Sequence, residues 1–298
     1  MKVQLLVVRA GPLSTIQDAG RFGMLEYGIS ASGPMDRSGY FEAAALLGTA
    51  PEGGIEFTTA GIELLVKEGR CRVGMAGGHF RAWHNDVELP WPTVVRVSAG
   101  DRLSILPGTA GNFGYLRFDH ALGLPKVLGS LSTNSRARLG GLSGRSLQAG
   151  DTLDLLKADS GVTYRPLVSI AGPIRVTWGL HAEAFSHTTR ELFGQRQFII
   201  SHRHDRMGVR LHDPHGVFAA TRMLSLVSDP VVAGDIQILG DGTPVVLMRD
   251  HQPTGGYPRI ATVTSADLDR LAQLRPGSPV AFTPVSVDHA HRAMQGQP

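Results

Sequence analysis

The stretch VVRVSAGDRLSIL, residues 94–106, places two short apolar runs on either side of Ser98-Ala99-Gly100-Asp101-Arg102. A third run of this kind is Val245-Val246-Leu247-Met248. The chain contains 37 glycines and 18 prolines, which separate such runs along its whole length. Short segments rich in β-branched residues and bounded by turn residues are typical of sandwiches and barrels. The sequence therefore predicts a mainly β fold.

Composition favours a globular protein of one large or two ordinary domains. Of the 298 residues, 42% are hydrophobic and 18% are charged, which is enough apolar material for a real core. The single cysteine, Cys71, excludes an internal disulfide and a thiol-based metal centre. We therefore expect a protein of the reducing cytoplasm.

Membrane and nucleic-acid classes are not favoured. The apolar run at residues 3–8 is too short for a signal peptide core, and no run approaches the roughly 20 residues that cross a bilayer. The net charge is +3, and the 29 basic residues are scattered rather than gathered in a stripe. We expect a soluble, unexported chain that binds neither membrane nor nucleic acid.

Few helices are predicted. Asp36 can cap a helix that runs to Leu47 and ends at Gly48. Thr264-Ser265-Ala266-Asp267 has the pattern of a capping box that opens a helix to Leu274. A third candidate runs from Ala182 to Leu192.

A weak internal repeat suggests two related domains. Asp18-Ala19-Gly20-Arg21 corresponds to Asp205-Arg206-Met207-Gly208, and Ala99-Gly100-Asp101-Arg102 corresponds to Arg275-Pro276-Gly277-Ser278 in the same order. The alternative is chance similarity between glycine-rich strand segments. We place the boundary at the polar stretch after the first half, which gives domains 1–157 and 158–298.

The first candidate site is the glycine-rich segment Gln17–Asp36. Its glycines let backbone amides approach an anion, and Arg21 can form a fork to a carboxylate or phosphate. The structural alternative is a tight turn in which Asp18 pairs with Arg21. The residue types leave both open.

The second candidate site is Arg249–Pro258, which directly follows an apolar strand. Asp250 or His251 can act as acid or base, while Gln252 and Thr254 can orient an amide or carboxylate. The alternative is an ordinary hairpin loop. A loop at a strand end that carries these groups favours the functional interpretation.

Other motifs exclude some chemistry. His202, His204 and Asp205 could ligate a metal, but with 12 histidines in the chain we expect no metal site. The segment Gly129–Leu142 offers hydroxyls and arginines to an anion without matching a P-loop or a dinucleotide fingerprint. No nucleophile elbow is present, so a self-contained hydrolase triad is not supported.

Six segments in order carry a resemblance over nearly the whole chain: Ser14–Arg21, Ser32–Asp36, Gly129–Thr133, Asp205–Gly208, Gly234–Gln237 and Gln252–Pro258. Together they resemble the family of allophanate hydrolase subunit 2, also described as the C subunit of 5-oxoprolinase or as a KipA-like biotin-dependent carboxyltransferase. The resemblance implies two cyclophilin-like β-barrel domains with a few short helices.

The resemblance also implies a function that depends on partners. It implies a subunit that opens 5-oxo-L-proline to L-glutamate with a KipI-like B subunit, an A-type subunit and ATP, which the complex rather than this chain can hold. One alternative is a KipA-like protein that regulates a KipI-like partner. Another is a carboxyltransferase component that acts on urea or a related amide. This sequence has no biotin attachment motif, so any biotin would belong to a partner.

The residues and the resemblance together predict a site. Asp250 and Asp18 are the predicted catalytic residues. The predicted substrate-binding residues are Gln17, Arg21, Ser32, Asp36, Arg206, Gln252, Thr254 and Tyr257. The chain departs from the usual family pattern at Leu131, His204, His251 and Pro253, which leaves the fold prediction intact and bears on the choice of substrate.

Overall fold

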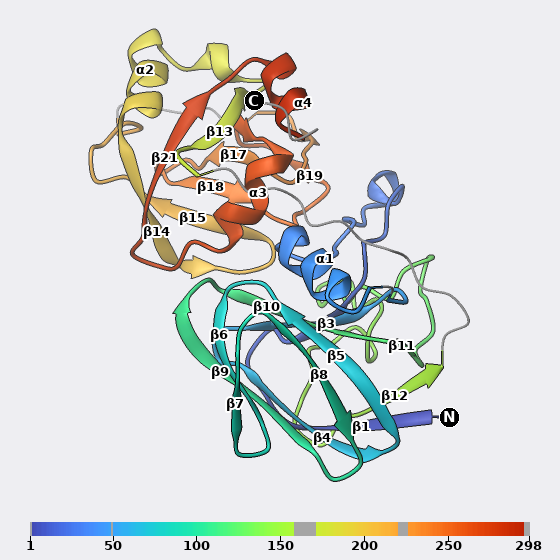
Figure 1. Cartoon of the computed structure of the whole chain (residues 1–298). Coiled ribbons are helices and arrows are strands. Elements are labelled where there is room, and N and C mark those ends of the chain that lie inside the picture. The colour runs from blue at the N-terminus through green and yellow to red at the C-terminus, as the bar shows by residue number, and fades with distance from the viewer. Residues whose placement is uncertain (1, 49, 158–170, 220–225, 295–298) are drawn as a thin grey trace. The chain divides into compact units, whose positions relative to one another are not determined.

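The computed structural model describes residues 2–48, 50–157, 171–219 and 226–294 (Figure 1). The chain divides into a first unit, Met1–Arg21 with Ser32–Leu167, and a second unit, Phe22–Ala31 with Val168–Pro298. The predicted boundary between residues 157 and 158 lies where the described residues break off, so it stays a prediction. Placing Phe22–Ala31 with the second unit was not expected from the sequence.

The described part of the first unit is built from strands and the helix α1 Arg37–Ala45. The strands are β1 Lys2–Ala10, β2 Thr15–Gln17, β3 Gly54–Thr58, β4 Ile62–Glu68, β5 Arg70–Ala76, β6 His79–His84, β7 Val87–Leu89, β8 Thr93–Ser98, β9 Arg102–Ala110, β10 Phe113–Phe118, β11 His120–Leu122 and β12 Thr152–Lys157.

Two sheets share the core of the first unit. One sheet has seven strands in the order β11-β12-β1-β4-β9-β6-β7, and the other has five in the order β2-β3-β10-β5-β8. Alternation along β1 buries Val3, Leu5 and Val7, which pack in one apolar cluster with Ile55 and Phe57 of β3. The two apolar runs within residues 94–106 become β8 and β9, which belong to different sheets.

The helix α1 begins where the sequence predicts. The Asp36 side chain accepts a hydrogen bond of 2.9 Å from the Gly39 amide, as an N-cap residue does. Gly74 of β5 lies under this helix, where an added Cβ would be 2.1 Å from the Ala43 carbonyl oxygen. The glycine therefore lets the helix approach the sheet closely.

The described part of the second unit contains strands, three α-helices and two short 3-10 helices. The strands are β13 Ile174–Trp178, β14 Gln197–His204, β15 Gly208–His212, β16 Asp229–Pro230, β17 Asp235–Ile238, β18 Pro244–Leu247, β19 Thr254–Gly255, β20 Arg259–Val263 and β21 Pro279–Pro284. The helices are α2 His187–Gln195, α3 Ser265–Ala272, α4 Val287–Met294, η1 Leu25–Tyr27 and η2 Ala182–Ala184.

A closed barrel forms the core of the second unit. Its strand order is β13-β20-β17-β18-β15-β14-β21, and a parallel pairing of β13 with β21 closes it. Phe193 of α2 stacks on Phe282 of β21 at 5.1 Å and packs near Phe198, so an aromatic cluster joins this helix to the barrel. The prediction of a mainly β protein with few helices is confirmed.

Two helix predictions need correction. The segment Ala182–Leu192 is not one helix, because Phe185 is extended and α2 begins at His187 after the N-cap Ser186. Helix α3 is present, but the capping box is wrong, since the Thr264 side chain makes no cap hydrogen bond. Within the described residues, no helix is both long and apolar enough to span a membrane.

Asp267 of α3 holds the barrel instead of capping its own helix. Its buried carboxylate accepts hydrogen bonds from Arg175 Nε at 2.8 Å, Arg175 Nη2 at 2.9 Å and Arg270 Nη1 at 2.9 Å. Burial alone would raise the pKa of Asp267, but the bonds from Arg175 outweigh it and the pKa is lowered. The ion pair therefore ties α3 to β13.

We expect Asp267→Asn to lower the free energy of unfolding by roughly 3 kcal/mol at pH 7, because it leaves buried arginine donors without their charged acceptor. A carboxyl whose pKa is lowered on folding stabilises above its unfolded pKa of about 3.9, and this contribution is lost as pH falls through the folded value. Urea unfolding of the wild type and the variant, at pH 7 and below pH 4, measures the difference in their free energies of unfolding. This difference should be smaller in acid.

Thr264→Val and Asp288→Asn are the controls for that measurement. The Thr264 hydroxyl is buried with no hydrogen-bond partner in the described residues, so its loss should be neutral or slightly stabilising. Asp288 is exposed on α4 and should be neutral as well. A large loss of stability in Thr264→Val would instead support the predicted capping box.

Candidate functional site

A buried carboxylate organises the candidate site of the first unit. Asp18 follows β2 and is only 3% exposed. Its Oδ1 accepts hydrogen bonds from the Ser130 hydroxyl at 2.6 Å, the Ser132 hydroxyl at 2.6 Å and the Gly20 amide at 3.0 Å. Its Oδ2 accepts a bond of 2.6 Å from the Leu131 amide. Asp18 therefore joins two segments that lie 112 residues apart.

These four bonds determine the charge state of Asp18. Burial raises the pKa of a carboxyl, but here the donors from Ser130, Ser132, Leu131 and Gly20 outweigh burial and lower it. A carboxylate whose pKa is lowered and whose lone pairs are occupied is a weak proton acceptor. The geometry supports an anchoring role, and the catalytic role of Asp18 stays a prediction.

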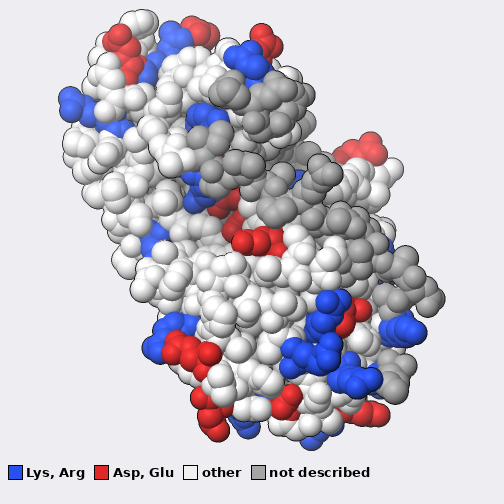
Figure 2. Space-filling model, in the orientation of Figure 1, with Lys and Arg blue, Asp and Glu red and all other residues white. Residues whose placement is uncertain are grey.

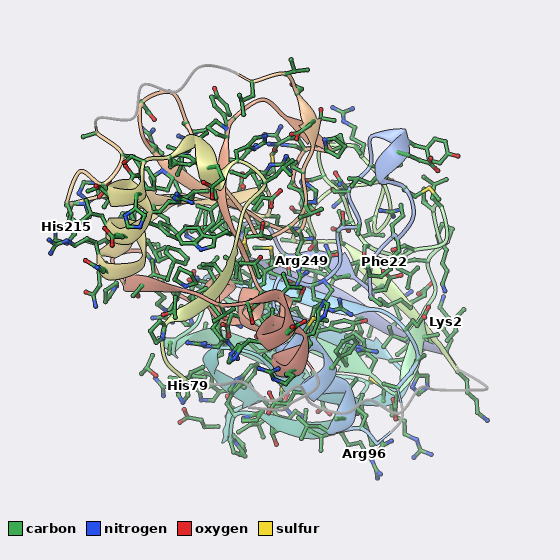
Figure 3. All side chains as sticks on the ribbon, turned by 90° about the horizontal axis from the view of Figure 1, so that it is seen from above. Lys2, Phe22, His79, Arg96, His215 and Arg249 are labelled. Atoms are coloured by element: carbon green, nitrogen blue, oxygen red, sulfur yellow. The ribbon has the colours of Figure 1, made fainter. Side chains whose placement is uncertain are left out.

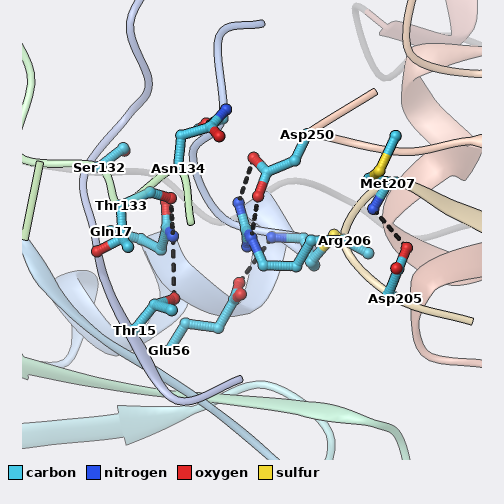
Figure 4. A network of polar contacts seen from close by, with 12 residues as sticks. Thr15, Gln17, Glu56, Ser132, Thr133, Asn134, Asp205, Arg206, Met207 and Asp250 are labelled. Carbon is cyan, nitrogen blue, oxygen red and sulfur yellow. Dashed lines mark hydrogen bonds and ion pairs between the residues drawn. The ribbon is translucent and has the colours of Figure 1, made fainter. Parts of the chain in front are cut away.

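Arg21 and Gln17 also bind the segment that contains Ser132, and Figure 4 shows Gln17 beside Thr15 and Thr133. Arg21 donates from Nε to the Val127 carbonyl and from Nη2 to the Ser132 carbonyl, both at 2.9 Å. Gln17 donates from Nε2 to Thr15 Oγ1 at 2.9 Å and to the Thr133 carbonyl at 3.2 Å. Asp18 and Arg21 both hold their loop in place, as the structural alternative to a binding site proposed. They do so by hydrogen bonds to residues 127–133 and not by an ion pair with each other.

Ser32 and Asp36 are also buried in this unit, each against its own partners. Ser32 has a left-handed backbone with φ of 55° and accepts a bond of 3.2 Å from Asn134 Nδ2. The Asp36 amide donates to the Tyr115 hydroxyl at 2.7 Å. That hydroxyl donates to Glu56 Oε2 at 2.8 Å. The structure therefore places Asp36 on the polar cluster around β3 and β10, whereas Ser32 contacts Asn134.

Glu56 and Tyr115 were not predicted from the sequence. Both are fully buried, and burial followed by the charge of Glu56 raises the pKa of Tyr115 well above its usual value. The sequence does hold a signal for Glu56, because this carboxylate lies between the apolar residues Ile55 and Phe57. A lone carboxylate in such a run has to find partners inside the protein.

The departure at Leu131 has a packing explanation. Leu131 belongs to the apolar core of the first unit, and its Cδ1 would lie 2.7 Å from a Cβ added at Gly53. The side chain fills space above that glycine. Leu131 therefore stabilises the core and offers no charge to a substrate.

In the second unit, Arg206 and Asp250 form a bidentate ion pair (Figure 4). Arg206 Nε donates to Asp250 Oδ2 at 2.8 Å and Nη2 donates to Oδ1 at 3.1 Å, with each side chain 5% exposed. The Asp250 amide also donates to the Arg206 carbonyl at 2.7 Å. Two predicted site residues thus meet, and the pair fixes the loop after β18 against the turn after β14.

His251 is the best placed proton acceptor in this loop. Its Nδ1 lies 2.6 Å from the Gln252 carbonyl, to which only a protonated nitrogen can donate. Burial lowers the pKa of His251, and the Gln252 carbonyl and the charges of Asp235 and Asp250 offset this only in part. The imidazole is therefore neutral at pH 7, with a lone pair on Nε2.

Two glutamine amides pair with each other, one from the residue after this histidine and one from β17. Gln252 Nε2 donates to Gln237 Oε1 at 3.3 Å, and Gln237 is 2% exposed. Gln237 Nε2 is buried with no hydrogen-bond partner in the parts of the chain that the structure describes. A Cβ added at Gly255 would lie 2.4 Å from that nitrogen, so only glycine leaves the donor in place. An unused buried donor of this kind is suited to a substrate carbonyl oxygen.

The remaining predicted residues lie at the surface. Thr254 is exposed on β19, and Tyr257 is 43% exposed. Neither makes a side-chain hydrogen bond within the described residues. His202, His204 and Asp205 form no metal cluster, since the described residues contain no group of three His, Cys, Asp or Glu side chains that could hold an ion.

The chain matches known proteins over most of its length. Residues 27–284 match the family model of the carboxyltransferase domain, subdomain A and B. The chain is 34% identical to the C subunit of 5-oxoprolinase from Haemophilus influenzae over 283 residues, covering 93% of this chain and 90% of that protein. It is 32% identical to the C subunit of 5-oxoprolinase from Escherichia coli over 303 residues, covering 98% and 95%. The crystal structure of K. lactis urea amidolyase superposes with a TM-score of 0.87 at 27% identity, covering 97% of this chain but 19% of that one.

We expect Asp18→Asn to lower the free energy of unfolding by about 3 kcal/mol, because its single amide nitrogen would face either the Leu131 amide or the Gly20 amide, and the negative charge that all four donors share would be lost. Thermal unfolding should show a lowered stability for Asp18→Asn and an unchanged stability for the exposed control Asp86→Asn. Stability equal to the wild type together with lost activity would instead make Asp18 a catalytic residue.

Proposed function

This chain belongs to the family of the carboxyltransferase domain, subdomain A and B, and from that membership we propose that it acts as the C-type subunit of an ATP-dependent 5-oxoprolinase. The single observation that carries the proposal is its identity of 32% or more to two proteins named as the C subunit of 5-oxoprolinase, over at least 90% of each length. The reaction opens 5-oxo-L-proline to L-glutamate in the cytoplasm.

The proposed function requires partners. We assign them as an A-type subunit and a KipI-like B subunit. The polar cluster around Asp18 is closed by the chain's own hydrogen bonds and does not fit the phosphates of ATP. We therefore assign ATP to a partner subunit, and any biotin likewise.

The proposed chemistry of this chain uses the loop after β18 together with Gln237 of β17. Gln237 Nε2, the unused buried donor, hydrogen-bonds the carbonyl oxygen of a lactam, and Gln252 holds the Gln237 amide in place. His251 Nε2 accepts a proton from the attacking water. Asp250 and Arg206 act by positioning this loop, because each already satisfies the other's charge.

Carboxyl transfer to an amide is the second candidate. It is favoured by the description of the matching family model and by the likeness in fold to urea amidolyase. In that reaction a carboxyl carrier on a partner replaces ATP-driven ring opening. A KipA-like binding protein would form the complex without any turnover.

We expect the chain, combined with A-type and B-type subunits, to give 5-oxoproline-dependent ATP hydrolysis and glutamate. His251→Gln should reduce the rate about 100-fold or more through loss of a proton acceptor, whereas His215→Gln, at an exposed position, should not. Coupled assays of phosphate and glutamate release measure both.

Three other outcomes would contradict this proposal. Carboxybiotin-dependent carboxylation without 5-oxoproline turnover would favour the second candidate. A tight complex with no turnover would favour a binding protein. A His251→Gln variant as active as the wild type would remove the histidine from the mechanism.

The pH dependence of kcat/KM tests the charge state of His251. Because burial disfavours the protonated ring, the pKa of His251 is lowered from 6.5, and the basic form predominates at neutral pH. The rate should therefore be constant near pH 7 and fall only below 6.5 as the ring takes up a proton. The residual rate of His251→Gln should lack this acid limb, and a limb centred above pH 7 would contradict the assignment.

A further inference from the structure

Three arginines share the outer face of the five-stranded sheet at the edge formed by β5 and β8. Arg72 of β5 lies directly opposite Arg96 of β8 in the strand register. Arg70 precedes Arg72 by two residues, so its side chain leaves β5 on the same face. Figure 2 shows basic side chains gathered over this part of the first unit, and Figure 3 shows Arg96 projecting outward.

A cavity of about 280 Å³ lies among these side chains, with Asp119 and His120 in its wall. Helix α1 covers the neighbouring part of this sheet face, above Gly74. The cavity adjoins the end of that covered part, where Arg72 Nη2 donates to the Leu47 carbonyl at 3.2 Å. The hollow is therefore lined by residues of β5 and β8 with Asp119 and His120, and one of its arginines is held by the segment that follows the helix.

The charges around this cavity do not balance. Among the described residues, Asp119 is the only carboxylate in its wall, and it is occupied by the Arg72 amide at 2.9 Å, Arg72 Nε at 3.2 Å and His120 Nδ1 at 2.7 Å. The guanidinium groups of Arg70 and Arg96 have no ion-pair or hydrogen-bond partner in the part of the chain that the structure describes. Two positive charges thus remain on one small surface.

Like charges on directly opposed strand positions destabilise a sheet. A bound anion removes that cost, and arginine forks match the oxygens of phosphate in pairs. Two unpaired positive charges match a dianion better than a single carboxylate. The volume is close to the lower end of ligand pockets, about 300 Å³, which suits a small molecule.

We propose that the pocket between β5 and β8 binds a small phosphate-bearing dianion through Arg70, Arg72 and Arg96. The site lies wholly within the first unit and shares no residue with the loop after β18. It is therefore independent of the proposed function, and either can fail without the other.

Isothermal titration with inorganic phosphate at constant ionic strength tests the site. The double variant Arg70→Gln/Arg96→Gln should bind phosphate at least about tenfold more weakly, since each charged hydrogen bond lost is worth a factor of this size. Arg203→Gln, an exposed arginine of the second unit, removes the same kind of charge elsewhere and should leave the affinity unchanged. Equal affinities of the wild type and the double variant would overturn the proposal, as would no binding by the wild type.

The nature of the ligand is tested by three further titrations. A small phosphate ester should compete with phosphate, and acetate at the same ionic strength should not. An acidic peptide that binds the arginines while phosphate does not would overturn the proposal in favour of a protein docking surface.

Stability separates ligand binding from a structural role. In phosphate-free buffer, Arg96→Gln should leave Tm unchanged or raise it, because the opposed charge on Arg72 is relieved. Circular dichroism should show that the variant is folded. A lowered Tm would mean that Arg96 supports the sheet, and this would contradict the proposal.

Discussion

The first unit depends on the satisfaction of one buried negative charge. Asp18 tolerates burial only because Ser130, Ser132, Leu131 and Gly20 all donate to it. Most of those donors come from a loop that is distant in sequence, so the charge can be buried only when that loop has docked. Arg21 and Gln17 then find their acceptors in the same loop, and the polar cluster closes as one network.

The second unit uses the same rule several times. Asp267 is held by Arg175, Asp250 by Arg206, and Asp235 accepts from Arg259 and Thr262. Once these groups have satisfied one another, little hydrogen-bonding capacity is left in the loop after β18. Within the described residues, the amide nitrogen of Gln237 on β17 has no hydrogen-bond partner, and the Nδ1 contact of His251 leaves its Nε2 available, so the proposed chemistry is placed on these two groups.

On the arginine face of β5 and β8, in contrast to the buried ion pairs, charges are exposed and, within the described part of the chain, not all of them are paired. There, charges of one sign gather at an exposed sheet surface with a single carboxylate among the described residues of the wall. Solvent screens such charges and makes the arrangement tolerable, whereas the same set inside either unit would prevent folding. An exposed imbalance of charge is compatible with a binding surface, and a buried one is not.

Features that depend on near neighbours in the chain could be predicted from the residues alone, whereas the pairing of distant groups could not. The β-branched runs became β8, β9 and β18, and Asp36 capped α1, because strand propensity and capping act over a few residues. By contrast, two runs joined by a short turn entered different sheets, Asp267 paired with Arg175 instead of capping, and Asp18 bound Ser130 and Ser132 rather than Arg21. The physical reason is that a buried polar group must be paired, and the packing of distant segments sets the partner that it finds. Local sequence records the need for a partner but not its identity.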